Sequence, residues 1–179
     1  MGAFEQPDTT FGREHLDELV SAFPNSTLTH QRVIPARPAR YADWPDWVSP
    51  ALRTALEDRG ITRLFSHQAE AAEAIHSKHN TVIATGTSSG KSLGYQLPVL
   101  SRLGTDRTAC ALYLTPTKAL GSDQLLSIQR LLRAATEGLP YLSTIAPAPY
   151  DGDTPTESRA GIRESSRFIF SNPDMVHAS

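Results

Sequence analysis

The sequence contains a single cysteine, Cys110, which excludes a disulfide within the chain. Cys110 begins the apolar run Cys-Ala-Leu-Tyr-Leu, so we predict a buried thiol in the core. The chain also lacks an apolar run as long as a membrane span, and it lacks an apolar signal core near its N-terminus. These absences favour a protein of the reducing, cytoplasmic compartment that has no membrane partner.

Positive charge is scarce in this sequence. The formal net charge is −2, and only three of the 17 basic residues are lysines, namely Lys78, Lys91 and Lys118. No general basic field therefore draws the chain to nucleic acid, and any such contact must be local. The 179 residues, 39% of them hydrophobic, are enough for one domain with its own core and an appendage.

Residues 80–92, Asn-Thr-Val-Ile-Ala-Thr-Gly-Thr-Ser-Ser-Gly-Lys-Ser, predict a short apolar strand, a phosphate-binding loop (P-loop) and the start of a helix. The backbone N–H groups of such a loop surround the oxygens of a triphosphate, and the helix start adds the positive end of its dipole. Lys91 would reach the β- and γ-phosphates, and the Ser92 hydroxyl would be a ligand of Mg²⁺. The residues expected to bind the nucleotide here are Thr87, Ser88, Ser89, Gly90, Lys91 and Ser92.

The P-loop departs from the full motif at its first position, where Thr85 replaces a glycine. The alternative is a surface turn rich in serine and glycine that happens to precede a helix. The order of strand, loop, Gly-Lys-Ser and helix favours nucleotide binding over that alternative.

Residues 1–48 are expected to form an N-terminal helix and an arm. Apolar residues recur at helical spacing between Leu16 and Phe23, which indicates an amphipathic helix that starts near Arg13 and ends before Pro24. Up to Pro50 the chain is then rich in proline, arginine and tryptophan, which favours an extended arm. Its arginines are either solvated charge or a contact for DNA: Arg32, Arg37 and Arg40.

A helix is predicted to begin at residue 50, because Ser49 is a natural N-cap and Pro50 suits the first helical position. Leu52, Ala55 and Leu56 would form its buried side, with Gly60 as the stop signal.

A second helix is predicted from Ala69 to about Lys78, with Ser66 as its cap and Gln68 in its first turn. The amide of Gln68 can donate and accept at once, which matches N7 and N6 of adenine. An ordinary polar residue of a first turn is the other interpretation, and the sequence leaves both open.

Three further strands are predicted, at Cys110–Leu114, Tyr141–Ile145 and Arg167–Ser171. Cys110–Leu114 is apolar throughout, as in strands buried on both faces of a parallel sheet. Strands that alternate with helices predict a doubly wound α/β fold, in which ligands bind at the carboxyl ends of the strands. Residues 115–118 and 172–174 occupy such ends, and Asn172 is a natural N-cap for a helix.

The segment Tyr150-Asp-Gly-Asp-Thr154 precedes another predicted helix. Thr154 and Glu157 would form a capping box at its start. Arg159 and Arg163 lie one turn apart on this helix, where they are either phosphate ligands or part of a solvated face.

No apolar strand after the P-loop ends in an aspartate. The carboxylate that completes a P-loop Mg²⁺ site is therefore missing, and so is the group that orients the attacking water. An acidic run does occur at Asp17-Glu18, but it precedes the P-loop on a predicted helix, so we do not consider it catalytic. We expect a domain truncated before its acidic motif, with no catalytic residue in this chain.

Together these blocks resemble the first motor domain of superfamily 2 (DEAD/DEAH-type) ATP-dependent DNA helicases over residues 49–179. Four segments are similar to those of RecQ-related bacterial and fungal repair helicases, as is the arm before Trp44. They are Thr85-x-Thr87-x-Ser89-Gly-Lys-Ser92, Ser66-His-Gln68, Tyr150-Asp-Gly-Asp-Thr154 and Ser171-Asn-Pro-Asp-Met175.

The resemblance implies a partial RecA-like α/β domain, with a parallel sheet flanked by helices, that binds ATP and Mg²⁺ and in which Gln68 reads adenine. The implied partners are single-stranded DNA, or a duplex with a single-stranded tail, and the remaining motor domain of the parent chain. The residues implied to touch the DNA backbone are Pro116, Thr117, Lys118, Asn172, Pro173 and Asp174.

Two other functions compete with a helicase, namely a small-molecule P-loop kinase and a nucleotide-sensing module without turnover. A kinase usually begins at its P-loop strand, whereas this chain has about 80 residues before it. An Asp-Glu-x-His run at a later strand end would identify the helicase.

Overall fold

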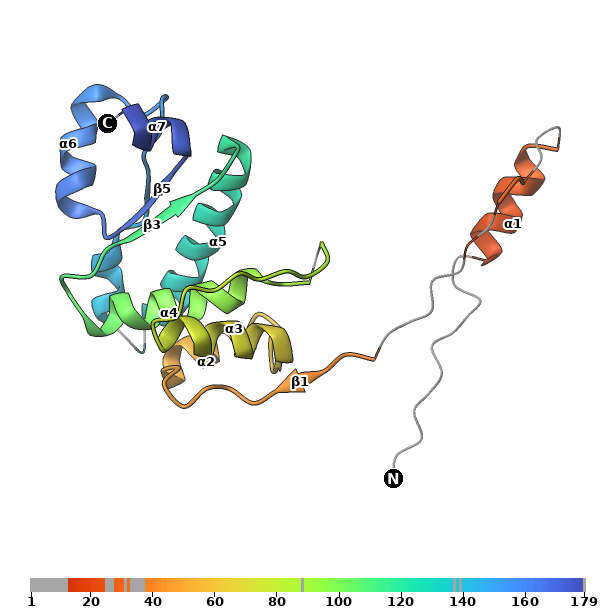
Figure 1. The fold of residues 1–179 in the computed structure, drawn as a ribbon, viewed down its shortest axis with the longest axis horizontal. Helices are drawn as coiled ribbons and strands as arrows, with labels where there is room; N and C mark the ends of the chain where they lie inside the picture. The colour runs from red at the N-terminus through yellow and green to blue at the C-terminus, as the bar shows by residue number, and fades with distance from the viewer. Residues whose placement is uncertain are drawn as a thin grey trace. The chain divides into compact units, whose positions relative to one another are not determined.

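The computed structural model describes residues 13–24, 28–30, 32, 38–87, 89–136, 138 and 140–178. These residues belong to two compact units, residues 1–39 and residues 40–179 (Figure 1). The division into domains at residues 1–48 and 49–179 stays a prediction. Within the described residues, no helix combines the length and apolar character needed to cross a membrane.

The first unit contains helix α1 (Arg13–Ala22), which confirms the helix predicted between Arg13 and Pro24. Leu19 and Val20 on this helix are exposed. Residues 25–27, 31 and 33–37 of the predicted arm, Arg37 among them, lie outside the described residues.

The second unit begins with the short strand β1 (Tyr41–Ala42), which pairs with β2 (Leu64–Phe65) in antiparallel orientation. Helix α2 (Pro50–Glu57) lies between these strands in the sequence, and its start is as predicted: the Ser49 hydroxyl accepts a hydrogen bond from the Leu52 N–H at 3.3 Å. The three side chains predicted for its inner face, Leu52, Ala55 and Leu56, are buried.

Helix α3 (Ser66–His76) begins three residues earlier than predicted. Ser66 is its first residue and not its cap, because the N-cap position belongs to Phe65. The N–H of Phe65 donates to Oε1 of Gln68 at 2.8 Å. A glutamine in the first turn thus accepts a backbone N–H that would otherwise lack a partner at the helix start.

A three-stranded parallel sheet forms the second half of the unit. Its order is β3 (Ala111–Leu114), β5 (Phe168–Ser171) and β4 (Ala148–Pro149). Helix α4 (Ser92–Thr105) follows the P-loop, and α5 (Lys118–Thr136) follows β3. The sheet lies between α5 on one side and α6 (Thr156–Ser165) and α7 (Pro173–Ala178) on the other (Figure 1). This confirms the predicted α/β class with a parallel sheet and flanking helices.

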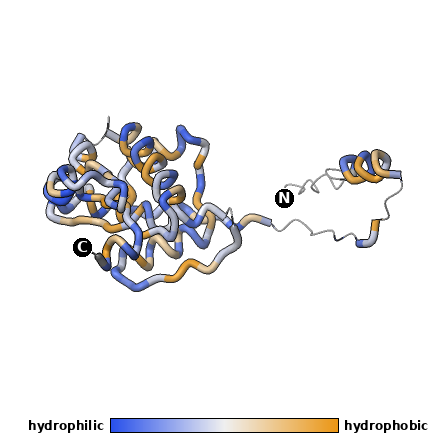
Figure 2. The backbone as a smooth tube through the Cα atoms, turned by 90° about the horizontal axis from the view of Figure 1, so that it is seen from above, coloured by the Kyte–Doolittle hydropathy of each residue, from blue (hydrophilic) through white to orange (hydrophobic). Residues whose placement is uncertain are grey.

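The core of the second unit lies between the helices and the sheet. Apolar and polar residues alternate along its helices (Figure 2), as expected where one face of a helix packs on a core. The largest fully buried side chains are Leu56, Leu64, Leu97, Leu100, Leu103, Ile128, Leu131, Ile145 and Phe168. Trp44 and Trp47 pack against this cluster and fix the segment before α2.

Two predicted strands are wrong. Residues 140–145 form a 3-10 helix, η1 (Pro140–Ile145), and the strand that follows is β4. The segment before the P-loop forms no strand pairing with any described strand, and the Val82 side chain is 92% exposed. A strand needs a neighbour to receive its backbone hydrogen bonds, so an apolar run alone does not make one.

The predicted burial of Cys110 is also wrong, since this thiol is exposed. It precedes the first residue of β3, where the chain has not yet entered the sheet. Strand β3 alternates half-buried and exposed residues, and Leu112 is 55% exposed. The described part of the chain therefore covers one face of β3 in part and leaves the other face exposed.

Candidate nucleotide-binding site

The P-loop is held by its own side chains. The hydroxyls of Thr85 and Ser89 lie 2.7 Å apart, and Nζ of Lys91 donates to the carbonyls of Thr85 at 3.1 Å and Gly86 at 3.3 Å. Thr85, which replaces the first glycine of the motif, thus contributes two contacts to the loop. Ser88 lies outside the described residues.

The backbone N–H groups of the described loop residues Thr87, Ser89, Gly90 and Lys91 have no acceptor among the described residues. They lie immediately before α4, whose 14 residues direct the positive end of the helix dipole toward the loop. Unpaired N–H groups, a lysine ammonium and a helix N-terminus are donors that suit phosphate oxygens. The loop therefore fits a phosphate group chemically.

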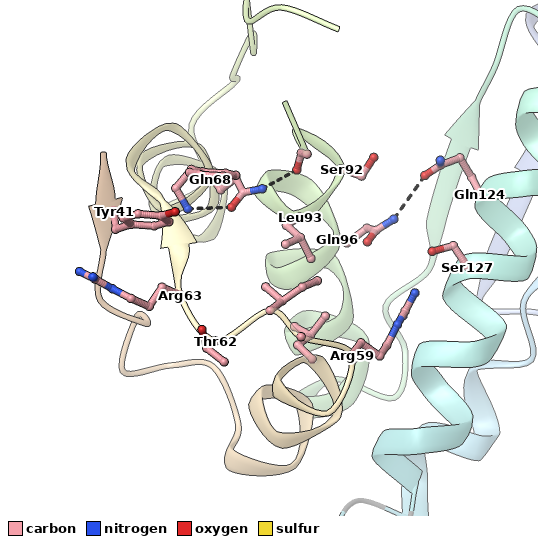
Figure 3. A pocket seen from close by; sticks show the side chains of 15 residues that line it. Tyr41, Arg59, Thr62, Arg63, Gln68, Ser92, Leu93, Gln96, Gln124 and Ser127 are labelled. Atoms are coloured by element: carbon pink, nitrogen blue, oxygen red, sulfur yellow. Dashed lines mark hydrogen bonds between the residues drawn. The ribbon is translucent and has the colours of Figure 1, made fainter. Parts of the chain in front are cut away.

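Gln68 connects α3 to the P-loop. Its Oε1 accepts from the N–H of Phe65, and its Nε2 donates to the carbonyl of Gly90 at 2.7 Å (Figure 3). The side chain is only 3% exposed. One N–H and one lone pair remain on the amide, so its role in reading adenine stays a prediction.

His67 makes a second connection between these segments. Its Nε2 lies 2.9 Å from the carbonyl oxygen of Ser89. Two consecutive side chains of α3 thus hold two consecutive carbonyls of the loop. Sequence reasoning missed His67, although its place beside Gln68 and a ring nitrogen able to donate were visible signals.

A pocket of about 650 Å³ adjoins the loop. Figure 3 shows Ser92, Leu93 and Gln96 of α4 on one side of it, facing Gln124 and Ser127 of α5 on the other. Its volume lies within the range of small-molecule sites. The pocket is lined by Tyr41, Leu56, Arg59, Gly60, Ile61, Thr62, Arg63, Phe65, Gln68, Gly90, Ser92, Leu93, Gln96, Gln124 and Ser127.

Aromatic rings and arginines also line this pocket. The Tyr41 and Phe65 rings stack with centroids 5.2 Å apart, and the Arg63 guanidinium lies 4.8 Å from the Tyr41 centroid. Arg59 also lines the pocket, and none of the lining residues that the structure describes is acidic. Sequence reasoning missed Tyr41, Arg59 and Arg63, because two-residue strands leave no periodic pattern that would bring Tyr41 to Phe65.

Ser92, the predicted Mg²⁺ ligand, is the first residue of α4 and lines the pocket. Within the described residues, no group of three or more His, Cys, Asp or Glu side chains could hold a metal ion. The hydroxyl of Ser92 is one oxygen ligand, and Mg²⁺ binding at this residue stays a prediction.

The two segments predicted to touch DNA meet at the carboxyl ends of β3 and β5. These strands are parallel neighbours, and the Thr115 N–H donates to the Ser171 carbonyl at 3.0 Å. Lys118 and Asn172 line the same small cavity. The predicted N-cap is confirmed, because Oδ1 of Asn172 accepts from the Met175 N–H at 2.8 Å. This second site shares no lining residue with the P-loop pocket, although α5 contributes to both.

Comparison with known proteins shows what this arrangement resembles. The DEAD/DEAH box helicase family matches residues 65–179. The ATP-dependent helicase HRQ1 of Saccharomyces cerevisiae is 39% identical over 88% of this chain and 14% of its own length. The ATP-dependent helicase YprA of Bacillus subtilis is 34% identical over 93% of this chain and 22% of its own length.

A crystal structure of the helicase MrfA bound to DNA and AMPPNP superposes with a TM-score of 0.80 at 34% identity. The match covers 91% of this chain and 22% of MrfA. This chain thus spans less than a quarter of the length of these relatives. The P-loop, the residues before it and the matched family together show that the chain belongs to the DEAD/DEAH box helicases of superfamily 2.

Proposed function

We propose that this chain is the ATP-binding portion of an ATP-dependent DNA helicase or translocase that couples ATP hydrolysis to movement on single-stranded DNA. The observation that carries the proposal is the set of N–H groups of Thr87, Ser89, Gly90 and Lys91, which have no acceptor among the described residues and lie directly before α4. Gln68 and His67 hold the carbonyls of the same loop. The names of HRQ1 and YprA as ATP-dependent helicases support the same function.

In this proposal the loop N–H groups and the Lys91 ammonium bind the phosphates, and Ser92 binds Mg²⁺. The base enters the pocket beside the stacked rings of Tyr41 and Phe65, where the remaining N–H and lone pair of Gln68 can face adenine. Because the Lys91 ammonium donates hydrogen bonds to the Thr85 and Gly86 carbonyls, a bound phosphate must replace these two carbonyls as its acceptor.

DNA contact is proposed at the carboxyl ends of β3 and β5, through Thr117, Lys118 and the start of α7 at Asn172. The substrate is single-stranded DNA or a duplex with a single-stranded tail, and the parent chain supplies the remaining motor domain. MrfA, which has been crystallised with DNA, supports DNA as the polymer. We place the parent among the RecQ-related repair helicases and in the cytoplasm.

Nucleotide titration tests the P-loop assignment. Fluorescent ATP analogue binding should be lost in Lys91→Ala and kept in the matched variant Lys78→Ala, whose lysine lines a different pocket. If Lys91→Ala binds as the wild type does, the P-loop does not bind the nucleotide.

Competition experiments on the same protein test the base. ATP should compete better than GTP, and Gln68→Ala should narrow the difference, since guanine presents a different donor and acceptor pattern to the amide. If GTP competes for the wild type as well as ATP does, Gln68 does not recognise adenine.

Anisotropy of a labelled single-stranded oligonucleotide tests the DNA contact. With about two or three phosphates engaged, the logarithmic salt slope should be about −0.7 per phosphate, which is shallow for a DNA-binding protein. A steep slope, or binding that survives Lys118→Ala, would show that DNA binds elsewhere on the chain. The first residues to test would then be Arg32, Arg37 and Arg40.

A further inference from the structure

The turn formed by residues 150–154 has no role in the function proposed above, yet it is tightly built. Oδ1 of Asp151 accepts from the Asp153 N–H at 2.9 Å, and Oγ1 of Thr154 accepts from the Asp151 N–H at 2.9 Å. The predicted capping box is absent, because Thr154 uses its hydroxyl in this turn and α6 has no side-chain cap. An aspartate and a threonine that bond backbone groups of their own turn fix its shape.

The same turn is anchored to both neighbouring elements. The N–H of Tyr150 donates to the Phe170 carbonyl of β5 at 2.7 Å. From α6, Arg159 donates to the Thr154 carbonyl at 3.1 Å, and Arg163 donates to the Tyr150 hydroxyl at 2.6 Å. These contacts assign both arginines to holding the turn in place.

The fixed turn presents one carboxylate to the proposed DNA contact. Oδ2 of Asp153 lies 2.6 Å from Nζ of Lys118, the first residue of α5. The hydrogen bond to Asp153, with smaller contributions from the charges of Asp153 and Asp151, raises the pKa of Lys118. The Asp153 side chain makes no other hydrogen bond or ion pair within the described part of the chain, so its contact with Lys118 is not needed to shape the turn.

Both partners of this ion pair remain open to solvent, with side chains 48% exposed for Lys118 and 77% for Asp153. Exposed ion pairs are weak and open readily. A phosphate oxygen accepts the same kind of charge-assisted hydrogen bond from an ammonium group as a carboxylate does. Asp153 therefore occupies the position that a DNA phosphate would need.

We propose that Asp153 masks Lys118, so that the DNA backbone must displace this carboxylate before it can bind at the ends of β3 and β5. The inference rests on the DNA contact proposed above and adds a residue that limits its affinity. The mask favours a ligand that offers several phosphates at once, because such a ligand replaces the lost ion pair and adds contacts to Thr117 and to the start of α7.

Oligonucleotide binding by the whole 179-residue chain tests the mask. Asp153→Asn keeps the shape of the side chain and removes its charge, so binding of single-stranded DNA at low salt should tighten about two- to fivefold, the range expected for an exposed ion pair. Asp151→Asn removes an equal charge from the same turn and keeps a side-chain oxygen for the Asp153 N–H. Its effect on DNA binding should be smaller, because the ion pair with Lys118 is made by Asp153. Glu164→Gln on the exposed side of α6 should change nothing.

Acylation of lysine amines followed by mass spectrometry tests the mask without DNA. The sequence has only three lysines, so Lys78 and Lys91 serve as internal references. Lys118 should react faster in Asp153→Asn, since the freed amine loses a hydrogen bond and is more often deprotonated.

The two measurements separate the possible failures. If Lys118→Ala weakens DNA binding while Asp153→Asn leaves it unchanged or weaker, the carboxylate does not mask the lysine and the inference is wrong. If no protein binds DNA, the proposed DNA contact is wrong, and faster labelling of Lys118 in Asp153→Asn would then still support a masked cation. Equal labelling in wild type and variant would overturn the mask in either case.

Discussion

Gly90 shows why a single position in the P-loop must be glycine. Its φ of +68° lies in the left-handed region, and a Cβ there would lie 2.6 Å from Nε2 of Gln68. A side chain would therefore strain the backbone and also displace the glutamine that binds the Gly90 carbonyl. The backbone angle and the glutamine contact require glycine independently.

We expect Gly90→Ala to lower the free energy of unfolding by about 1–2 kcal/mol, the cost of a left-handed residue with a side chain. Nucleotide affinity should fall as well, because the displaced Gln68 no longer holds the loop. Gly86→Ala is the matched control, since a Cβ at Gly86 would meet nothing within 4 Å. Urea denaturation and ATP titration of both variants check this, and equal behaviour of the two would show that the Gln68 contact does not shape the site.

Between elements, a pair of tyrosines joins the P-loop helix to the sheet. The hydroxyls of Tyr95 on α4 and Tyr113 on β3 lie 2.8 Å apart, and the Tyr95 hydroxyl also donates to Oε1 of Gln124 on α5 at 3.1 Å. Gln124 lines the P-loop pocket, while Lys118 on the same helix belongs to the proposed DNA contact. The network thus joins three elements, two of which contribute to the candidate sites.

Because of this pair, we expect the stability of the chain to fall at alkaline pH. Burial, followed by the hydrogen bond with Tyr95, raises the pKa of Tyr113 above its ordinary value of 10.0. Above pH 10 the folded chain keeps the phenol proton of Tyr113, while the unfolded chain loses it. The contribution of this tyrosine to the free energy of unfolding is therefore fully present below pH 10 and is lost as the pH rises further. Urea denaturation between pH 8 and 11 should show a steeper loss for the wild type than for Tyr113→Phe. Tyr41→Phe is the control, and parallel curves for wild type and Tyr113→Phe would contradict the prediction.

The elements that the sequence predicted well are those set by local chemistry. Ser49 with Pro50 and Asn172 with Pro173 start helices through neighbouring residues alone, and Gly90 and Lys91 directly precede α4, as the local spacing of their motif predicted. Strand pairing and burial depend on distant residues, which explains the failures at Cys110 and at residues 140–145. The contact between Lys118 and Asp153 also joins distant segments, and no sequence pattern announces it.

On the scale of the whole molecule, the residues proposed to bind nucleotide and DNA occupy two places, and α5 contributes to both. The sequence has no Asp-Glu-x-His run after the P-loop. Within the described residues, no acidic cluster lies ready to bind a metal beside Ser92. Phosphoryl transfer depends on a metal-binding carboxylate, a group that orients water and an arginine finger. We therefore expect this chain to bind nucleotide without turning it over.

We predict that residues 1–179 alone bind ATP but neither hydrolyse it nor unwind a duplex. An arginine finger by itself contributes about 10³ to 10⁵ in rate, so its loss together with the carboxylate and the water-orienting group should leave turnover at background. Phosphate release, measured with and without single-stranded DNA, checks this, with the longer yeast helicase HRQ1 as the positive control. DNA-stimulated turnover that disappears in Lys91→Ala would contradict the prediction and would mean that carboxylates already in this chain complete the Mg²⁺ site.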